Sequence, residues 1–130
     1  MSVPVPVEEL SETVDRYGAA TILLTVNDEL RSHATNVQVE VSGAEIRCGV
    51  GRRTTANMLA RPLVSFLWPP TEPGGYSLIA DGEAVVEPDG DNGGTAVITV
   101  SNAVLHRPAT TEPDPDAACA SDCVTVEVSE

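Results

Sequence analysis

The chain contains no lysine. All seven of its cationic residues are arginine, the chain has 20 aspartate and glutamate residues, and the formal net charge is −13. A surface of that sign repels the phosphate backbone of nucleic acids, so we expect no nucleic-acid partner. The sequence also lacks an apolar run long enough to cross a bilayer, and its first ten residues lack the basic and apolar regions of a signal peptide. We therefore expect a cytoplasmic protein with no membrane contact.

Aromatic residues and cysteines are both scarce. Aromatics make up 3% of a chain that is 42% hydrophobic, so the core must consist of valine, leucine, isoleucine and alanine, and abundant valine favours strands. Three cysteines do not suggest a disulfide framework. Cys48 fits a buried position on its strand. The spacing of Cys119 and Cys123 leaves open a redox pair or half a metal site, but nothing completes a tetrahedral set, so we predict no metal.

Hydrophobic periodicity predicts a mainly β domain that begins with one helix. Apolar residues recur at helical spacing from Val7 to Tyr17, and Gly18 supplies a stop signal. Alternating or buried strand patterns follow over 19–26, 31–41, 45–50, 63–68, 76–87 and 95–107. Gly82 lies in the middle of the fifth of these strands, where we expect a bend or a bulge.

A short helix is predicted between the third and fourth strands. Thr54 or Thr55 can cap it, Met58 and Leu59 give it an apolar side, and Pro62 prevents its continuation.

The chain divides into a folded part and a tail. Residues 1–107 hold all the long periodic segments and form the predicted domain, whereas 108–130 are acidic and rich in proline and are expected to be mobile. Within the tail, 124–128 have the alternation of one last short strand. Deletion of 108–130 should therefore leave a folded domain.

Three stretches carry a family resemblance: the strand 31–41, the turn and helix 51–62 running into VSFLW, and the strand YSLIADGEAVV. They resemble the flavin- or deazaflavin-binding split barrels related to pyridoxamine 5'-phosphate oxidase. There, a basic pair after a strand precedes a short helix with Asn or Gln, a proline and a buried strand. This chain places Arg53, Thr54, Asn57, Pro62 and Val64 in that order. The resemblance implies a split β-barrel with an N-terminal helix, a short helix between strands 3 and 4, and a homodimer with its pocket between subunits.

The basic turn is the candidate phosphate site. Arg52 and Arg53 lie where a strand passes into a helix, so their guanidinium groups, the hydroxyls of Thr54 and Thr55 and the free amides at the helix start can converge on a phosphate. Asn57 belongs to the same motif by resemblance. The alternative is that the arginines are solvated or paired with carboxylates while a threonine merely caps the helix. Many relatives carry lysine where this chain has Thr54.

The flavin ring is placed by resemblance alone. In relatives it lies against the strand that contains Thr35, Asn36 and Val37, although the polar start of that strand is equally consistent with simple exposure. Trp68 either walls the pocket, closes the dimer or packs in the core.

No catalytic residue can be assigned. His33 and His106 have no evident acidic partner, so neither is a convincing base. The resemblance implies an oxidoreductase in which FMN carries hydride to or from an unidentified small molecule. We favour FMN over an 8-hydroxy-5-deazaflavin coenzyme because two arginines suit one terminal phosphate, whereas an acidic polyglutamate tail needs a longer basic groove. A non-catalytic carrier, storage or sensor protein, or a chain without cofactor, remains the alternative.

Overall fold

A computed structural model describes residues 1–90 and 92–109. The strand expected over 124–128, the two tail cysteines and nearly all of the tail predicted over 108–130 lie outside the described residues. The boundary at 107 therefore stays a prediction.

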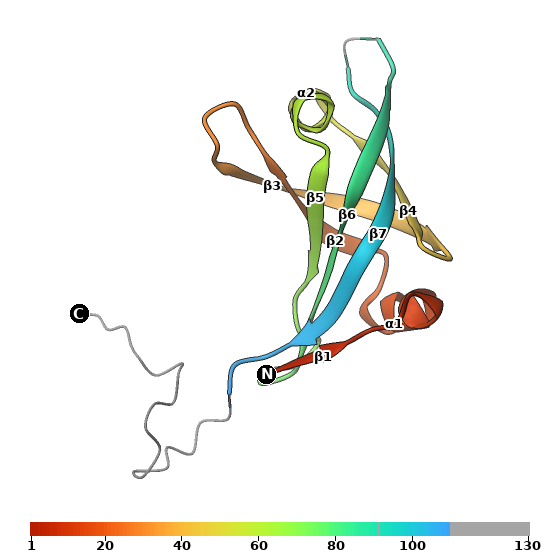
Figure 1. Ribbon diagram of the computed structural model, residues 1–130, viewed down its shortest axis with the longest axis vertical. Coiled ribbons are helices and arrows are strands. Elements are labelled where there is room, and N and C mark those ends of the chain that lie inside the picture. Colours follow the sequence, from red (N-terminus) through yellow and green to blue (C-terminus); the bar gives the residue numbers. More distant parts are fainter. Residues whose placement is uncertain (91, 110–130) are drawn as a thin grey trace, which may run out of the picture.

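The described chain is a closed six-stranded antiparallel barrel (Figure 1). The strands follow the order β7-β4-β3-β2-β5-β6, and pairing between β6 and β7 closes the ring. Their bounds are β2 Ala20–Val26, β3 Ser32–Ser42, β4 Glu45–Val50, β5 Leu63–Trp68, β6 Ser77–Pro88 and β7 Gly94–His106. All six strands were predicted from periodicity, and the mainly β split-barrel architecture is confirmed.

The N-terminal segment departs from the prediction. Ser2–Pro4 form a short strand, β1, that pairs with the end of β7. Proline can belong to this strand because β1 lies at the edge of the sheet. The predicted helix then divides into a 3₁₀ turn, Val7–Glu9, and the α-helix α1, Leu10–Tyr17. Gly18 ends α1 with a positive φ of 102°, as its position suggested.

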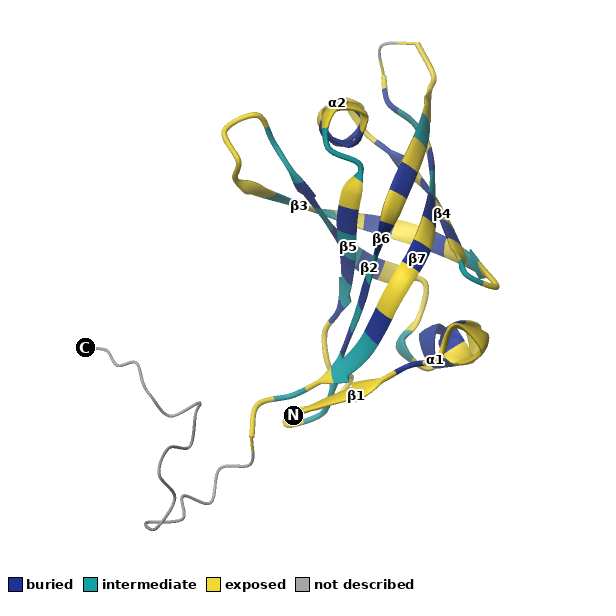
Figure 2. Cartoon of the chain, viewed as in Figure 1, coloured by how far each residue is buried: buried dark blue, intermediate teal, exposed yellow. Residues whose placement is uncertain are grey.

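Two rows of side chains cross the strands β2, β5, β6 and β7, one residue apart. The inner row is fully buried (Figure 2) and consists of Leu23, Phe66, Ala80 and Ala103. The outer row is only half-buried and consists of Ile22, Leu67, Ile79 and Val104. The inner row continues into a core that includes Cys48, whose thiol pKa is raised by burial from 9.0 to about 11.

Gly82 lies at the predicted irregularity. The register between β6 and β7 shifts between Asp81 and Gly82. A Cβ atom on Gly82 would clash with the carbonyl oxygen of Thr99 and lie 2.6 Å from the Cγ2 atom of Ile98. Glycine is therefore required by the close approach of the two strands.

The short helix α2, Arg52–Ala60, forms where it was expected, but its capping was predicted wrongly. Gly51 is the N-cap residue, with no side-chain bond to the helix. Thr54 and Thr55 lie inside the helix and are buried, and the hydroxyl of Thr55 donates to the Gly51 carbonyl at 2.8 Å. A buried hydroxyl bonds back to the preceding turn because no solvent reaches it.

The apolar side of α2 is also narrower than predicted. Met58 is buried against the barrel, whereas Leu59 is 62% exposed. The helix ends before Pro62, as expected. None of the helices in residues 1–90 and 92–109 is long and apolar enough to span a membrane.

Candidate functional site

A hollow of about 310 Å³ lies between α2 and the hairpin that joins β2 to β3. The helix contributes Arg53, Ala56 and Asn57, β3 contributes His33, and the hairpin turn contributes residues 27–29. Two of the predicted site residues, Arg53 and Asn57, are therefore brought together, and the volume lies at the lower end of the range for small-molecule pockets.

Asn57 is fixed by the barrel. Its side-chain nitrogen donates to the Thr25 hydroxyl at 3.0 Å, and both residues are buried. This bond anchors α2 to β2 and holds Asn57 at the lining of the hollow. Thr25 was not identified from the sequence, because no local pattern indicates a contact 32 residues apart.

Charge at the start of α2 is unusual. The first turn contains Arg52 and Arg53 and no acidic residue. Cations at the positive end of the helix dipole are unfavourable, and a bound anion would offset that cost. Both arginines are exposed, and the one ion pair recorded for residues 1–90 and 92–109 joins Arg61 to Asp28 at 2.9 Å.

The hairpin turn adds opposing charge. Asp28 and Glu29 both line the hollow, and Asp28 is engaged by Arg61. The sequence analysis predicted strands over 19–26 and 31–41 and gave no role to the residues between them. That turn is held by Asn27, whose side-chain oxygen accepts from the backbone N–H groups of Glu29 and Arg31, each at 3.0 Å.

The first half of β3 has an open edge beside this hollow. Val39 N donates to Ala19 O and Asn27 N donates to Arg31 O, so the odd-numbered residues direct their backbone groups toward β2. The even-numbered residues, including Ala34 and Asn36, therefore direct N–H and C=O away from β2. Pairing with β4 begins only at Val39, so these backbone groups have no strand partner in the described chain.

Thr35, Asn36 and Val37, the residues predicted to contact the flavin ring, all lie in this open segment but differ in how far they are buried. Asn36 is exposed, Thr35 is half-buried, and Val37 points into the core. Only the backbone of the segment offers a row of hydrogen-bonding groups.

Other predicted residues lie elsewhere. Thr54 is only 3% exposed, so its hydroxyl does not face the hollow. Trp68 is the last residue of β5, where it is 1% exposed, and its Nε1 donates at 3.0 Å to the carbonyl oxygen of Gly18 at the end of α1. Its ring packs beside Phe66 with centroids 5.8 Å apart. Within the single chain, Trp68 is a core residue.

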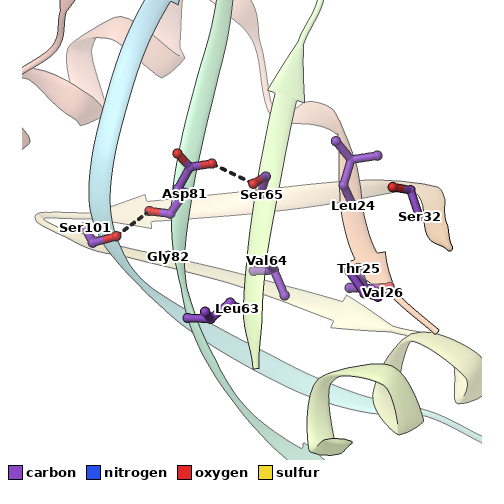
Figure 3. Close-up of a pocket in the computed structure, with 10 residues that line it drawn as sticks. All are labelled: Leu24, Thr25, Val26, Ser32, Leu63, Val64, Ser65, Asp81, Gly82 and Ser101. Atoms are coloured by element: carbon purple, nitrogen blue, oxygen red, sulfur yellow. Dashed lines mark hydrogen bonds between the residues drawn. The ribbon is translucent and has the colours of Figure 1, made fainter. Parts of the chain in front are cut away.

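A second hollow of about 450 Å³ lies across β2, β5 and β6 (Figure 3). Its polar groups include a Ser65 hydroxyl that donates to the Asp81 carboxylate at 2.6 Å and a Ser101 hydroxyl that donates to the Asp81 carbonyl at 3.3 Å. No histidine is among the residues that line it. Across residues 1–90 and 92–109, no three His, Cys, Asp or Glu side chains gather in a metal-binding arrangement.

Sequence comparison supplies a relative of this chain. The chain is 38% identical over 123 residues to an uncharacterized protein of Mycobacterium bovis, covering 82% of this chain and 84% of that protein. No established family profile matches the sequence.

Solved structures share the fold. A putative pyridoxamine 5'-phosphate oxidase from Listeria innocua superposes with a TM-score of 0.60 at 16% identity, covering 75% of this chain and 98% of that one. An F420 reductase gives 0.59 at 17% identity, with 76% and 98% covered. An FMN-binding protein from Syntrophomonas wolfei gives 0.58 at 13% identity, with 76% and 85% covered.

The chain therefore has the split-barrel fold of the pyridoxamine 5'-phosphate oxidase-like proteins, which confirms the resemblance at the level of fold. It belongs to one family with the mycobacterial protein.

Proposed function

We propose that the protein binds FMN at a homodimer interface and transfers hydride between that flavin and a small molecule. The observation that carries the proposal is the open backbone edge of β3 beside the two arginines of α2. The solved neighbours with this fold include proteins described as FMN-binding and as an F420 reductase, which supports a cofactor of the flavin type.

The open edge suits the polar rim of a flavin. That rim presents alternating carbonyl and N–H groups, and the backbone groups of Ala34 and Asn36 offer complementary donors and acceptors on one line. Backbone recognition requires no particular side chains, which explains why this strand has no conspicuous functional residue. When FMN is bound, its ring supplies the hydride chemistry, and the chain orients it and excludes water.

The start of α2 suits the phosphate. Arg53 lines the hollow, Arg52 is its neighbour, and the free amides of the first turn lie on the same helix. A single terminal phosphate matches this small site better than an extended polyanion, because Glu29 and Asp28 lie on the opposite wall.

The outer row supports a dimer. Four half-buried aliphatic side chains, Ile22, Leu67, Ile79 and Val104, stand side by side on a sheet face that no helix of the described chain covers in Figure 1. A second copy placed on this face would bury them. The hollow of Figure 3 adjoins the same face, so a partner subunit would also enclose it.

Flavin titration tests the proposed site. Arg53→Ala should weaken FMN binding by about 1.5–3 kcal/mol, roughly ten- to a hundredfold in Kd, because a charge-assisted bond to phosphate is lost. Arg47→Ala is the matched control, since Arg47 is an exposed arginine on β4 outside the hollow. If folded Arg53→Ala binds FMN as tightly as the wild type, the phosphate does not bind at the start of α2.

Light scattering tests the dimer. Leu67→Arg places a charge in the middle of the outer row and should give a monomer that has lost most of its FMN affinity. Thr95→Arg is the control, because Thr95 is exposed at the far end of β7. A wild-type chain that binds FMN as a monomer would contradict the shared pocket.

Two alternatives follow from specific observations. The F420 reductase among the neighbours favours a deazaflavin coenzyme, which mass spectrometry of the copurified cofactor would distinguish from FMN. His33 is the one histidine that lines either of these two hollows in the described chain. This shortage of acid–base groups favours a carrier or sensor. A bound flavin that bleaches with a reductant and recovers with an acceptor supports catalysis, whereas colour without turnover supports carriage.

A further inference from the structure

A third hollow, of about 520 Å³, lies at the end of the barrel opposite α2 (Figure 1). The end of α1 contributes Arg16 and Tyr17, the loop between β5 and β6 contributes residues 71–76, and the segment at the end of β7 contributes Leu105 and Arg107. It shares no lining residue with the hollow at α2, and its size suits a small organic ligand.

Arg107 is held in one orientation. Its guanidinium carbon lies 4.4 Å from the centroid of the Tyr76 ring. The hydroxyl of that ring donates to the Met1 sulfur at 3.1 Å, and the backbone carbonyl of Tyr76 accepts from the Tyr17 hydroxyl at 2.8 Å. A guanidinium stacked on an immobilised ring loses little freedom when it binds an anion.

Arg107 also has an unused donor. Its Nε is buried and has no hydrogen-bond partner among the described residues. This Nε is too deeply buried to meet a ligand directly, but Arg107 lines the hollow and its terminal guanidinium nitrogens form no hydrogen bond within residues 1–90 and 92–109, so they are the donors that an anion can reach. No carboxylate of residues 1–90 and 92–109 forms an ion pair with it.

The other charges of the hollow limit the ligand. Arg16 is exposed on the last turn of α1, and Glu72 is the one carboxylate on the lining. Two guanidinium groups and one carboxylate attract a singly charged anion, whereas a second negative charge on the ligand would face Glu72. Leu105 and Pro73 offer apolar contacts for the body of the ligand.

We propose that this hollow binds the carboxylate of a small organic acid, with Arg107 as the fixed anion-binding group and Arg16 as the second. A guanidinium fork matches the two oxygens of a carboxylate. The rest of the surface carries a strong excess of negative charge, so a local pair of cations is needed to capture any anion there.

Benzoate is the probe, titrated into the full chain without flavin and followed by backbone amide NMR. We expect saturable shifts at Gly74, Gly75 and Tyr76 with a Kd on the order of a millimolar or tighter. Inorganic phosphate, titrated at a pH of about 8 where the dianion dominates and compared with benzoate at the same pH, should bind at least about tenfold more weakly because of Glu72.

Charge-removing variants decide which residues act. Arg107→Gln should weaken benzoate binding about tenfold or more, and Arg16→Gln by a smaller factor, whereas Arg47→Gln on β4 should leave it unchanged. Arg16 is exposed on a helix, so its variant remains a test even where Arg107→Gln does not fold.

Three results would overturn the proposal. They are the absence of saturable shifts with benzoate in the wild type, unchanged affinity in the folded arginine variants, and phosphate binding as tight as benzoate. The last result would indicate a general anion site instead of a carboxylate site.

Discussion

The inner and outer rows of β2, β5, β6 and β7 come from neighbouring residues on the same strands, yet their surroundings differ completely. The inner row is buried and consists of two large side chains followed by two alanines, whereas the outer row is half-buried and uniformly aliphatic. Because strand side chains alternate between faces, a step of one residue moves a side chain from the core to the surface.

The difference between the rows separates two kinds of information. The inner row combines two large side chains with two alanines because the barrel interior must be filled without voids, so this row specifies the fold. The outer row fills nothing within one chain. The proposed dimer would bury its aliphatic side chains, so the outer row bears on that proposal and not on the fold of one chain.

The largest expected effect is on the inner row. Phe66→Ala removes a fully buried ring in contact with Trp68 and should lower the free energy of unfolding by about 3–5 kcal/mol. Denaturant unfolding measures it. Leu67→Ala, one residue along, should cost clearly less, and equal losses in the two variants would break the distinction between the rows.

A substitution at Gly82 tests how closely β6 and β7, two of the strands that carry both rows, approach each other. Gly82→Ala drives a Cβ atom into the backbone of Thr99 and should destabilise the protein by about 1–3 kcal/mol. Gly49→Ala on β4 is the matched control, because nothing lies within 4 Å of its added Cβ atom. A thermal melt in which both variants behave like the wild type would show that β6 and β7 separate readily at this point.

Among these variants, Cys48→Ala should change the free energy of unfolding least at neutral pH. Cys48 belongs to the same core as the inner row, and its burial can be tested through the pH dependence of stability. Burial raises the pKa of its thiol to about 11 from 9.0, so the unfolded chain releases this proton at lower pH than the folded chain. The raised pKa therefore contributes stability that is fully present below pH 9 and is lost as pH rises toward 11. Unfolding curves of the wild type and Cys48→Ala across this window should show the additional decline only in the wild type.

The candidate site was predicted in part. Arg53 and Asn57 came from a local motif, and the structure places both at one hollow. The capping role of Thr54 or Thr55 was predicted wrongly, because the same motif does not show which side of the helix faces the barrel. Trp68 had several open roles, and its burial near α1 is determined by strands and a helix that are distant in sequence.

The sequence by itself determined the six barrel strands, the stop at Gly18, the irregularity at Gly82 and the end of α2 before Pro62, because periodicity and backbone preferences act over a few residues. Tertiary structure alone decided that β1 pairs with β7, that β3 keeps an open edge until Val39, and that Arg107 stacks on Tyr76. Each of these features joins segments whose contact depends on closure of the barrel, and no local pattern encodes that closure.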